Sequence, residues 1–431
     1  MMLVRGKNGR KQPRLLFIGD AACATGFARV THALLDRLCV SWDVHVLGIN
    51  YHGDPHRFPY PIYPAALGGD ALGVGRYANL VQQLDPDMVL ILHDPWVIQA
   101  FLDHKGPEPM VAYVPIDAQN IAAAPALKAL NHVVFYTEFG EAQCRFSGYE
   151  GPATVIPHGI DMQLFCPIPQ ADARAALGWG EALPEDAFVF GNINSNQPRK
   201  RIDLTLLAFA AFVREWEAGG EGQRPPYLLL HMPPRAPYGY DLIQLGQALG
   251  VGHRIVFPHA CESGDERRGG DSFGPVPDVC LPLIYNALDV QMSTSTGEGF
   301  GLTTMEGMAC GIPQILPRHS ALAEWAAGVA LFVDCAGYWT TPNGVNTIGR
   351  VIDEGKLLQA MGALYRAPDA RAELRQAGLG RVQQPCFAWD VIADRFDRLL
   401  QQVLEAATPP GDMDLARIEP EEWEALHAAP A

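Results

Sequence analysis

Short, β-branched apolar runs alternate with helical stretches along most of this 431-residue chain. Continuous apolar strands separated by helices are typical of parallel sheets that are covered on both faces. The expected strands form two series: 15–18, 44–49, 88–92, 110–114, 132–136 and 154–156, then 188–193, 227–232, 254–258, 289–293, 313–316 and 329–333. A helix is expected over 27–38, where apolar residues recur on one face. The chain is therefore predicted to fold as two doubly wound, Rossmann-like α/β domains.

The chain length supports this division, because 431 residues exceed one ordinary core and suit two domains. The first domain is predicted over 1–168 and the second over 169–385. The segment 261–278 is rich in Gly, Ser, Pro and charge and is predicted to be a mobile loop. A flexible tail is predicted over 408–431, which is rich in Pro and Glu.

Composition excludes several classes of protein. The formal net charge of −16 disfavours nonspecific binding to nucleic acid or to an anionic membrane. No apolar run approaches the roughly 20 residues of a membrane span, so no integral membrane association is expected. Nine scattered cysteines without paired spacing indicate reduced thiols in a cytoplasmic protein. The basic N-terminus is interpreted as a solvated tail; its cations are Arg5, Lys7, Arg10, Lys11 and Arg14.

In open α/β sheets, ligands bind beyond the carboxyl ends of the strands. After the first strand, the stretch GDAACATGFARV places Gly26 at the opening of a helix, with Thr25 in position to cap it. The spacing is not GxGxxG, so no dinucleotide fingerprint is present. Gly26 either presents a helix N-terminus to a ligand or makes a tight turn, and the sequence does not separate these two readings.

Polar residues follow two further strands of the first series. His93 and Asp94 come after the strand 88–92, and Asp117 follows the strand 110–114. All three are expected to point into the crevice. Each could instead be a helix cap or a turn residue, and this alternative carries more weight for His93 than for Asp117.

In the second domain, three consecutive cations stand at the start of a helix: Arg199, Lys200 and Arg201. Basic charge there opposes the helix dipole and is normally disfavoured. A bound anion would reverse the sign of that interaction. The position therefore predicts an anion site more strongly than a solvated basic turn.

The stretch STGEGFG follows the strand 289–293 and leads into a helix. Its glycines 297, 299 and 301 let the backbone approach a ligand, and the helix N-terminus favours phosphate. Glu298 and Glu306 would repel phosphate, so they are expected to accept hydrogen bonds from hydroxyls on the same ligand. The pattern predicts a nucleoside diphosphate with a sugar at each end.

These residues resemble the E-x7-E signature of retaining GT-B glycosyltransferases of the family four type. The matching stretch is Glu298-Gly-Phe-Gly-Leu302 followed by Glu306-Gly-Met-Ala309, Gly311 and Pro313. The segments VIPHGIDMQLF, KRIDLTLLAF and FAWDVIADRF are similar to further family segments, and the resemblance runs from residue 19 to about 404. It implies a GT-B fold, with two domains facing a central cleft and a final helix over 386–407 that crosses back to the first domain.

The resemblance also implies roles for individual residues. Glu306 would bind the donor ribose, and Lys200 would neutralise the diphosphate. The donor sugar and phosphates would be held by Asn194, Glu298, Gly299, Phe300, Gly301 and Leu302, with Gly26 facing them from the first domain. The family's cationic residue is Asn192 here, so Arg199 would substitute for it. The family's first-domain histidine falls near Pro115, which leaves Asp117 or His93 as the catalytic candidate on that side.

The function that follows is transfer of a sugar from a nucleoside diphosphate sugar, for example UDP-glucose, to an acceptor hydroxyl with retention of configuration. Neither a metal nor a separate cofactor is expected, and the two DxD strings (Asp85-Pro-Asp87 and Asp412-Met-Asp414) are interpreted as chance. The alternatives are a sugar-nucleotide epimerase, which the E-x7-E block disfavours, and a non-catalytic sugar-nucleotide binding protein.

The acceptor stays open between a glycan, a lipid, a small molecule and a hydroxymethylated base in DNA. The last alternative rests on a resemblance of the stretches HDPW, YTEFG and NQPRKR to phage- and virus-borne members of the family. The basic N-terminus and the loop cations Arg267 and Arg268 favour DNA, whereas the net charge of −16 opposes it.

Overall fold

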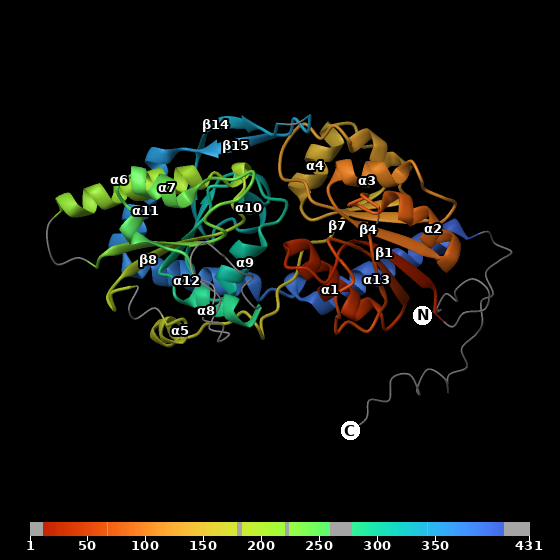
Figure 1. The fold of residues 1–431 in the computed structure, drawn as a ribbon, viewed down its shortest axis with the longest axis horizontal. Coiled ribbons are helices and arrows are strands. Elements are labelled where there is room, and N and C mark those ends of the chain that lie inside the picture. The colour runs from red at the N-terminus through yellow and green to blue at the C-terminus, as the bar shows by residue number, and fades with distance from the viewer. Residues whose placement is uncertain are drawn as a thin grey trace, which may run out of the picture.

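The structure, a computed structural model, describes residues 12–66, 68–178, 183–219, 224–258, 278–342 and 344–408 (Figure 1). Several features singled out in the sequence lie outside these ranges. They are the cations at positions 5–11, most of the predicted loop with Arg267 and Arg268, and the tail with Asp412 and Asp414. The described part contains two α/β domains that lie side by side in Figure 1.

The N-terminal domain is built on a seven-stranded parallel sheet in the order β3-β2-β1-β4-β5-β6-β7. Every residue of its central strands β4 and β5 is buried, which explains their unbroken apolar sequences. The strands are β1 (Arg14–Asp20), β2 (Asp43–Ile49), β3 (Ile62–Pro64), β4 (Met88–Leu92), β5 (Met110–Val114), β6 (His132–Phe135) and β7 (Ala153–Val155).

Helices cover both faces of this sheet. They are α1 (Gly26–Leu38), α2 (Val74–Leu84), α3 (Pro95–Leu102), α4 (Glu138–Phe146) and the 3₁₀ helix η2 (Ala124–Ala129). Helix α1 buries Val30, Leu34 and Leu38 on the face that its apolar spacing predicts. Thr25 caps α1, as expected, because its hydroxyl accepts a hydrogen bond from the Ala28 amide at 3.1 Å.

The C-terminal domain contains a six-stranded parallel sheet in the order β10-β9-β8-β11-β12-β13. Its strands are β8 (Phe188–Ile193), β9 (Pro226–His231), β10 (Ile255–Val256), β11 (Val290–Met292), β12 (Gln314–Pro317) and β13 (Leu331–Val333). Its helices are α5 (Gln170–Ala176), α6 (Ile202–Ala218), α7 (Leu242–Ala248), α8 (Leu281–Asn286), α9 (Leu302–Ala309), α10 (Ser320–Trp325), α11 (Glu354–Arg366) and α12 (Pro368–Val382). Short 3₁₀ helices are η3 (Pro198–Lys200), η4 (Gly252–Arg254), η5 (Asp278–Cys280) and η6 (Pro385–Phe387).

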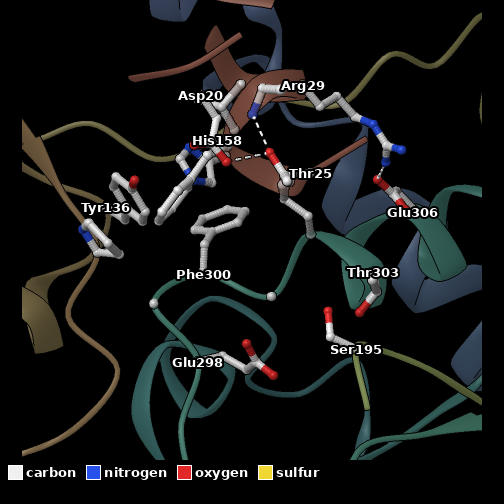
Figure 2. Close-up of a pocket in the computed structure, with 18 of the residues that line it drawn as sticks. Asp20, Thr25, Arg29, Tyr136, His158, Ser195, Glu298, Phe300, Thr303 and Glu306 are labelled. Atoms are coloured by element: carbon white, nitrogen blue, oxygen red, sulfur yellow. Dashed lines mark hydrogen bonds and ion pairs between the residues drawn. The ribbon is translucent and has the colours of Figure 1, made fainter. Parts of the chain in front are cut away.

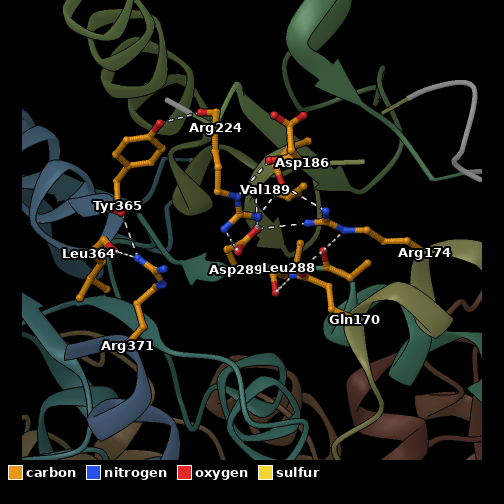
Figure 3. A network of polar contacts seen from close by, with 12 residues as sticks. Gln170, Arg174, Asp186, Val189, Arg224, Leu288, Asp289, Leu364, Tyr365 and Arg371 are labelled. Atoms are coloured by element: carbon orange, nitrogen blue, oxygen red, sulfur yellow. Dashed lines mark hydrogen bonds and ion pairs between the residues drawn. The ribbon is translucent and has the colours of Figure 1, made fainter. Parts of the chain in front are cut away.

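A carboxylate with little exposure lies at the end of the C-terminal sheet where its strands begin. Asp289, just before β11, accepts hydrogen bonds from Arg174, Arg224 and the Val189 amide at 2.8–3.1 Å (Figure 3). Gln170 donates to the Leu288 carbonyl beside it at 2.9 Å. Because the carboxylate is matched by two guanidinium groups, this charge can be buried at the base of the domain without a large desolvation penalty.

The prediction of two doubly wound domains is confirmed, and all twelve predicted strands are present with small shifts at their ends. Three strands were not predicted. One is the edge strand β3, and the others form an antiparallel hairpin of β14 (Cys335–Thr340) and β15 (Ile348–Ile352). The hairpin stands apart from both main sheets, and the residues of β14 alternate in exposure, so they do not form the apolar run that marks a covered strand.

Two elements of the C-terminal half reach the N-terminal domain. Helix α13 (Trp389–Ala407) lies beside α1, where Arg37 Nε donates to Asp390 at 2.5 Å (Figure 1). The hairpin pairs with the segment after β5, because the Gln119 and Ile348 backbones exchange hydrogen bonds of 2.9 and 3.0 Å. Within the described residues, no helix is long and apolar enough to cross a membrane.

Candidate active site

A large cavity of about 2720 Å³ lies between the two domains. It is lined by the segments that follow the carboxyl ends of β1, β4 and β5 in the N-terminal domain. In the C-terminal domain it is lined by the segments that follow β8, β9 and β11. This is where ligands bind in doubly wound folds. The cavity therefore collects most of the residues that the sequence singled out.

Lys200 and Glu298 form the ion pair at the centre of this cavity. Lys200 ends η3, and its side chain is only 8% exposed. Its Nζ donates to Glu298 Oε1. Burial, and then the charge of Arg199, lowers the pKa of Lys200 to about 8 against the opposing effect of Glu298. Burial alone would raise the pKa of Glu298, but the charges of Lys200 and Arg199 outweigh it and hold that pKa below its usual value.

Arg199 connects the two domains. Its Nη1 donates to the Gly297 carbonyl at 3.0 Å and lies 3.3 Å from Asp117 Oδ2 of the N-terminal domain. The same nitrogen is 3.9 Å from Glu298. Arg199 and Lys200 therefore place two positive charges beside Glu298 and at the wall of the cavity.

Arg201 does not contact the cavity as Arg199 and Lys200 do. It adopts the left-handed conformation, with φ of 48°, at the start of α6 and pairs with Asp203 at 2.8 Å. Its side chain is 19% exposed. It does not line the cavity. The backbone turn at Arg201 thus separates one cation from the two that can reach a ligand.

The glycine-rich loop is packed more tightly than the sequence suggested. A Cβ at Gly297 would lie 1.8 Å from the Asp117 carbonyl, and one at Gly299 would lie 2.9 Å from Pro115. Gly297 is needed for contact with the N-terminal domain, whereas Gly299 also lines the cavity. Gly301 has φ of 92° and begins α9. These glycines therefore serve the approach of the two domains as well as that of a ligand.

Glu306 lies in α9 and is held from two sides. Its Oε2 accepts a hydrogen bond of 2.6 Å from the Tyr285 hydroxyl. Its Oε1 pairs with Arg29, which extends from α1 across the domain boundary (Figure 2). The carboxylate is 2% exposed and lines the cavity. A ligand hydroxyl that reaches Glu306 would have to share this carboxylate with Arg29 or displace it.

The remaining predicted donor residues also line the cavity. Asn194 follows β8 and donates to Asn192 at 2.9 Å, while Asn192 itself is buried beneath it. Gly26 approaches Leu302 across the domain boundary, since a Cβ there would lie 3.5 Å from the Leu302 side chain. Phe300 stacks on Trp325, with ring centroids 5.3 Å apart. The cavity walls formed by Asn194, Gly26, Phe300 and Leu302 are thus built from both domains.

On the N-terminal side, Asp117 and Asp94 line the cavity, but His93 does not. His93 is almost fully buried, and its Nδ1 accepts a hydrogen bond of 2.8 Å from the Asp94 amide. Burial lowers its pKa, so the ring is neutral. The structure therefore brings Asp117 to the site and leaves His93 as a turn residue beneath it.

Several residues at the site were missed or not assigned a role. Arg29 and Tyr285 hold Glu306, and no motif in the sequence connects them to it. Asp94 was predicted to point into the crevice, and it does line the cavity, but it was given no role in binding or catalysis. The hairpin adds Thr341, Val345 and Thr347 to the cavity wall. Asp94 alone had a usable signal, its place after β4.

No group of three or more His, Cys, Asp or Glu side chains is placed to hold a metal ion in the part of the chain that the structure describes. Of the DxD strings, Asp85-Pro-Asp87 lies at the start of β4, at the opposite end of the sheet from the cavity. There Asp87 Oδ2 accepts a hydrogen bond of 2.7 Å from the Arg14 amide.

Curated proteins that match part of this chain share one name. No family model matches the chain. It is 29% identical over 248 residues to D-inositol 3-phosphate glycosyltransferase of Segniliparus rotundus, covering 56% of this chain and 44% of that protein. The protein of the same name from Mycobacterium leprae is 28% identical over 242 residues, covering 55% and 46%. The match thus spans less than half the length of these relatives.

Solved structures match over nearly the whole chain. Sucrose-phosphate synthase from Thermosynechococcus elongatus has a TM-score of 0.69 at 19% identity, covering 92% of this chain and 100% of that one. Anabaena HepE in complex with UDP and glucose has a TM-score of 0.65 at 17% identity, covering 91% and 100%. The fold is therefore GT-B, with two Rossmann-like domains facing a central cleft.

Proposed function

We propose that this protein is a retaining glycosyltransferase of the E-x7-E type, which moves a sugar from a nucleoside diphosphate sugar to an acceptor hydroxyl. The observation that carries the proposal is the cluster of Lys200, Arg199 and Glu298 at the centre of the interdomain cavity. Lys200 and Arg199 bring two positive charges to the cavity wall, where they lie beside Glu298 and Asp117 and next to the N-terminus of α9, so a bound diphosphate can pair with both cations. Such a site suits a diphosphate leaving group that carries a sugar.

UDP-glucose is the best candidate for the donor. A structural neighbour, HepE, is described in complex with UDP-glucose. Lys200 and Glu306 both line the cavity of this chain. In the proposed arrangement the diphosphate contacts Lys200 and Arg199. Glu306 accepts hydrogen bonds from the ribose diol, and Glu298 accepts them from hydroxyls of the donor sugar.

In the transfer step, the bond between the anomeric carbon and the phosphate oxygen breaks, and its electron pair stays on the diphosphate. The acceptor oxygen forms a bond to the same carbon from the same face, and the acceptor proton passes to the departing phosphate oxygen. The negative charge that grows on the diphosphate is stabilised by Lys200 and Arg199. Preorganised charges of this kind are commonly the largest contribution to catalysis.

Two alternatives have less support: a sugar-nucleotide binding protein without activity, and transfer of the sugar to a base in DNA. A binding protein without activity has no need of a buried lysine whose ammonium is costly to enclose, yet Lys200 is held in the cavity by Glu298. For a DNA acceptor, all the favourable cations but Arg14 lie outside the described residues, and Arg14 is paired with Asp43. The net charge of −16 also opposes DNA binding.

The proposal is tested with the purified full chain and a panel of nucleoside diphosphate sugars. UDP-glucose is expected to bind in calorimetry and to release UDP slowly by hydrolysis in the absence of acceptor. NMR of the transferred sugar is expected to show the anomeric configuration of the donor. A protein that binds no nucleoside diphosphate sugar, or that binds one and never breaks the glycosidic bond, would contradict the proposal.

A further inference from the structure

Asp94 occupies the N-cap position of α3 but does not act as a cap. Asx residues at this position usually accept a hydrogen bond from a helix amide. Here Pro95 follows, and within the described residues no helix amide donates to the Asp94 carboxylate. The side chain is 40% exposed and lines the cavity. The carboxylate lies 3.8 Å from the neutral His93 ring, which is beyond hydrogen-bond distance, so it can accept hydrogen bonds from a ligand in the cavity.

An exposed aromatic ring lies two residues further along. Trp96 is 53% exposed and lines the same wall of the cavity. The His93 ring supports it from below in an edge contact, with centroids 6.2 Å apart. His93 also contacts Phe27 at 5.4 Å, and Phe27 lines the cavity from α1. The neutral, buried His93 thus holds two aromatic side chains at the cavity surface.

The charge at this wall is predominantly negative. Asp94, Asp117 and Asp20 all line the cavity here, and Arg199 is the cation close to them. Burial, and then the charge of Asp117, raises the pKa of Asp94 to about 7. The surrounding charges therefore disfavour any further negative charge near Asp94.

The C-terminal hairpin closes the far side of this wall. Gln119 and Asn120 bind the backbone of the segment between β14 and β15, with Asn120 Nδ2 donating to the Asn346 carbonyl at 2.8 Å. Thr341, Val345 and Thr347 of that segment line the cavity. The hairpin therefore adds small polar and apolar side chains to the wall of the cavity that also holds Trp96.

We propose that Asp94, Trp96 and Asp117 form the acceptor subsite and that the acceptor is a neutral saccharide or polyol. This inference rests on the proposed function and names the substrate class of the same site. The apolar C–H face of a sugar ring packs on the indole, whose negative face attracts C–H groups. The acceptor hydroxyls donate hydrogen bonds to the two carboxylates, which accept at several positions each.

The same geometry disfavours a phosphorylated acceptor. Its phosphate would face Asp94, Asp117 and the bound donor diphosphate. Two arginines on α1 are engaged elsewhere, Arg29 with Glu306 and Arg37 with Asp390. Another arginine, Arg57, lines the cavity near His32 and Asp36 and is not among the charges that act on Asp94. The relatives named D-inositol 3-phosphate glycosyltransferase carry a phosphorylated compound in their name. The neutral acceptor proposed for this chain differs from that compound.

The test pairs neutral acceptors with their phosphate esters. The full chain is incubated with UDP-glucose and with glucose, maltose, sucrose, myo-inositol and related neutral compounds, then with the matched phosphates and with DNA containing hydroxymethylcytosine. UDP release and product mass are measured. Binding of each compound to the protein–UDP complex is followed by saturation-transfer NMR, so acceptors are ranked even where turnover is slow.

Neutral compounds are expected to bind and react at least about tenfold better than their phosphates. Asp94→Asn and Trp96→Ala are each expected to raise the acceptor KM by about 30-fold or more, while UDP affinity changes less than about twofold. Asp103→Asn, an exposed residue at the other end of α3, is the matched control and should behave as wild type.

Preference for a phosphate ester or for DNA would overturn the inference, as would an unchanged acceptor KM in both variants or the absence of binding by every neutral compound. UDP-glucose binding and hydrolysis without acceptor are measured on the same samples. Their loss would contradict the proposed function itself, so the two failures are distinguishable.

Discussion

Replacing Lys200 with methionine should slow transfer far more than it weakens donor binding. The change removes the charge and keeps most of the apolar stem, in a side chain that is only 8% exposed. In the donor-bound enzyme the ammonium would contact the leaving diphosphate. Only the part of the interaction that strengthens as the bond breaks contributes to kcat.

The size of this effect follows from the geometry. A unit charge about 4 Å from another is worth about 4 kcal/mol at an effective dielectric constant of about 20. If about half of that develops in the transition state, the loss is about 2 kcal/mol, or about 30-fold in kcat. Removal of single preorganised donors in other enzymes costs about 10²-fold or more. We therefore expect kcat to fall by about 30- to 100-fold at saturating donor.

The adjacent cation is the matched control. Arg201→Asn removes a charge one residue away, and asparagine tolerates the left-handed conformation at this position. Because Arg201 pairs with Asp203 and does not line the cavity, kcat should stay within about threefold of wild type. A wild-type kcat in Lys200→Met together with a large loss in Arg201→Asn would refute the assignment.

A second variant separates catalysis from charge balance. In Lys200→Met, the Glu298 carboxylate keeps Arg199 at 3.9 Å but loses its hydrogen-bonded partner. The double variant Lys200→Met/Glu298→Gln removes that unbalanced charge. If the double variant recovers wild-type kcat, Lys200 serves only to neutralise Glu298 and has no role in stabilising the leaving group. Kinetics at saturating donor, with thermal unfolding as a check of folding, decide between these results.

Three further predictions concern the donor site. Glu306→Gln keeps an acceptor for the Tyr285 hydroxyl but removes the charge that pairs with Arg29, so some loss of Tm is expected. Donor affinity should fall by about tenfold or more in calorimetry, and unchanged affinity would show that Glu306 does not bind the ribose. Because the pKa of Lys200 is about 8, its charged form is present below that pH, and a bound diphosphate should raise the pKa. Donor binding at pH 8 should therefore take up about half a proton, measured by calorimetry in buffers of different ionisation enthalpy, with little uptake at pH 6.5 and none in Lys200→Met. Because Lys200 and Arg199 are proposed to neutralise the diphosphate, transfer should survive EDTA, and complete loss that Mn²⁺ or Mg²⁺ restores would contradict this.

The periodicity of apolar residues was enough to predict the two sheets. Strands such as β4 and β5 are buried along their whole length, so their sequences are continuous apolar runs that a local window detects. Strand β14 escaped detection because it lies outside the covered layers and alternates in exposure. Strand β15 is short, and Gly349 and Arg350 interrupt its apolar residues. Their role is set by pairing with Gln119, which is more than 200 residues away in the chain.

The position of a residue along the sequence also determined much of the candidate site. In a parallel βα fold, every segment that follows a strand lies at the same edge of its sheet, so Lys200, Glu298, Glu306 and Asp117 could be placed there from the order of elements alone. Local sequence likewise predicted that Thr25 caps α1, since a cap depends on three neighbouring residues.

Only the tertiary structure decided which of these residues meet. Arg29 and Glu306 are 277 residues apart, and Gly297 packs on Asp117 from the other domain. Such contacts depend on how two separately folded domains approach each other, and no local pattern encodes that geometry. The same is true of His93 and Asp94, because a small change in the direction of the chain after β4 buries the first side chain and turns the second toward the cavity.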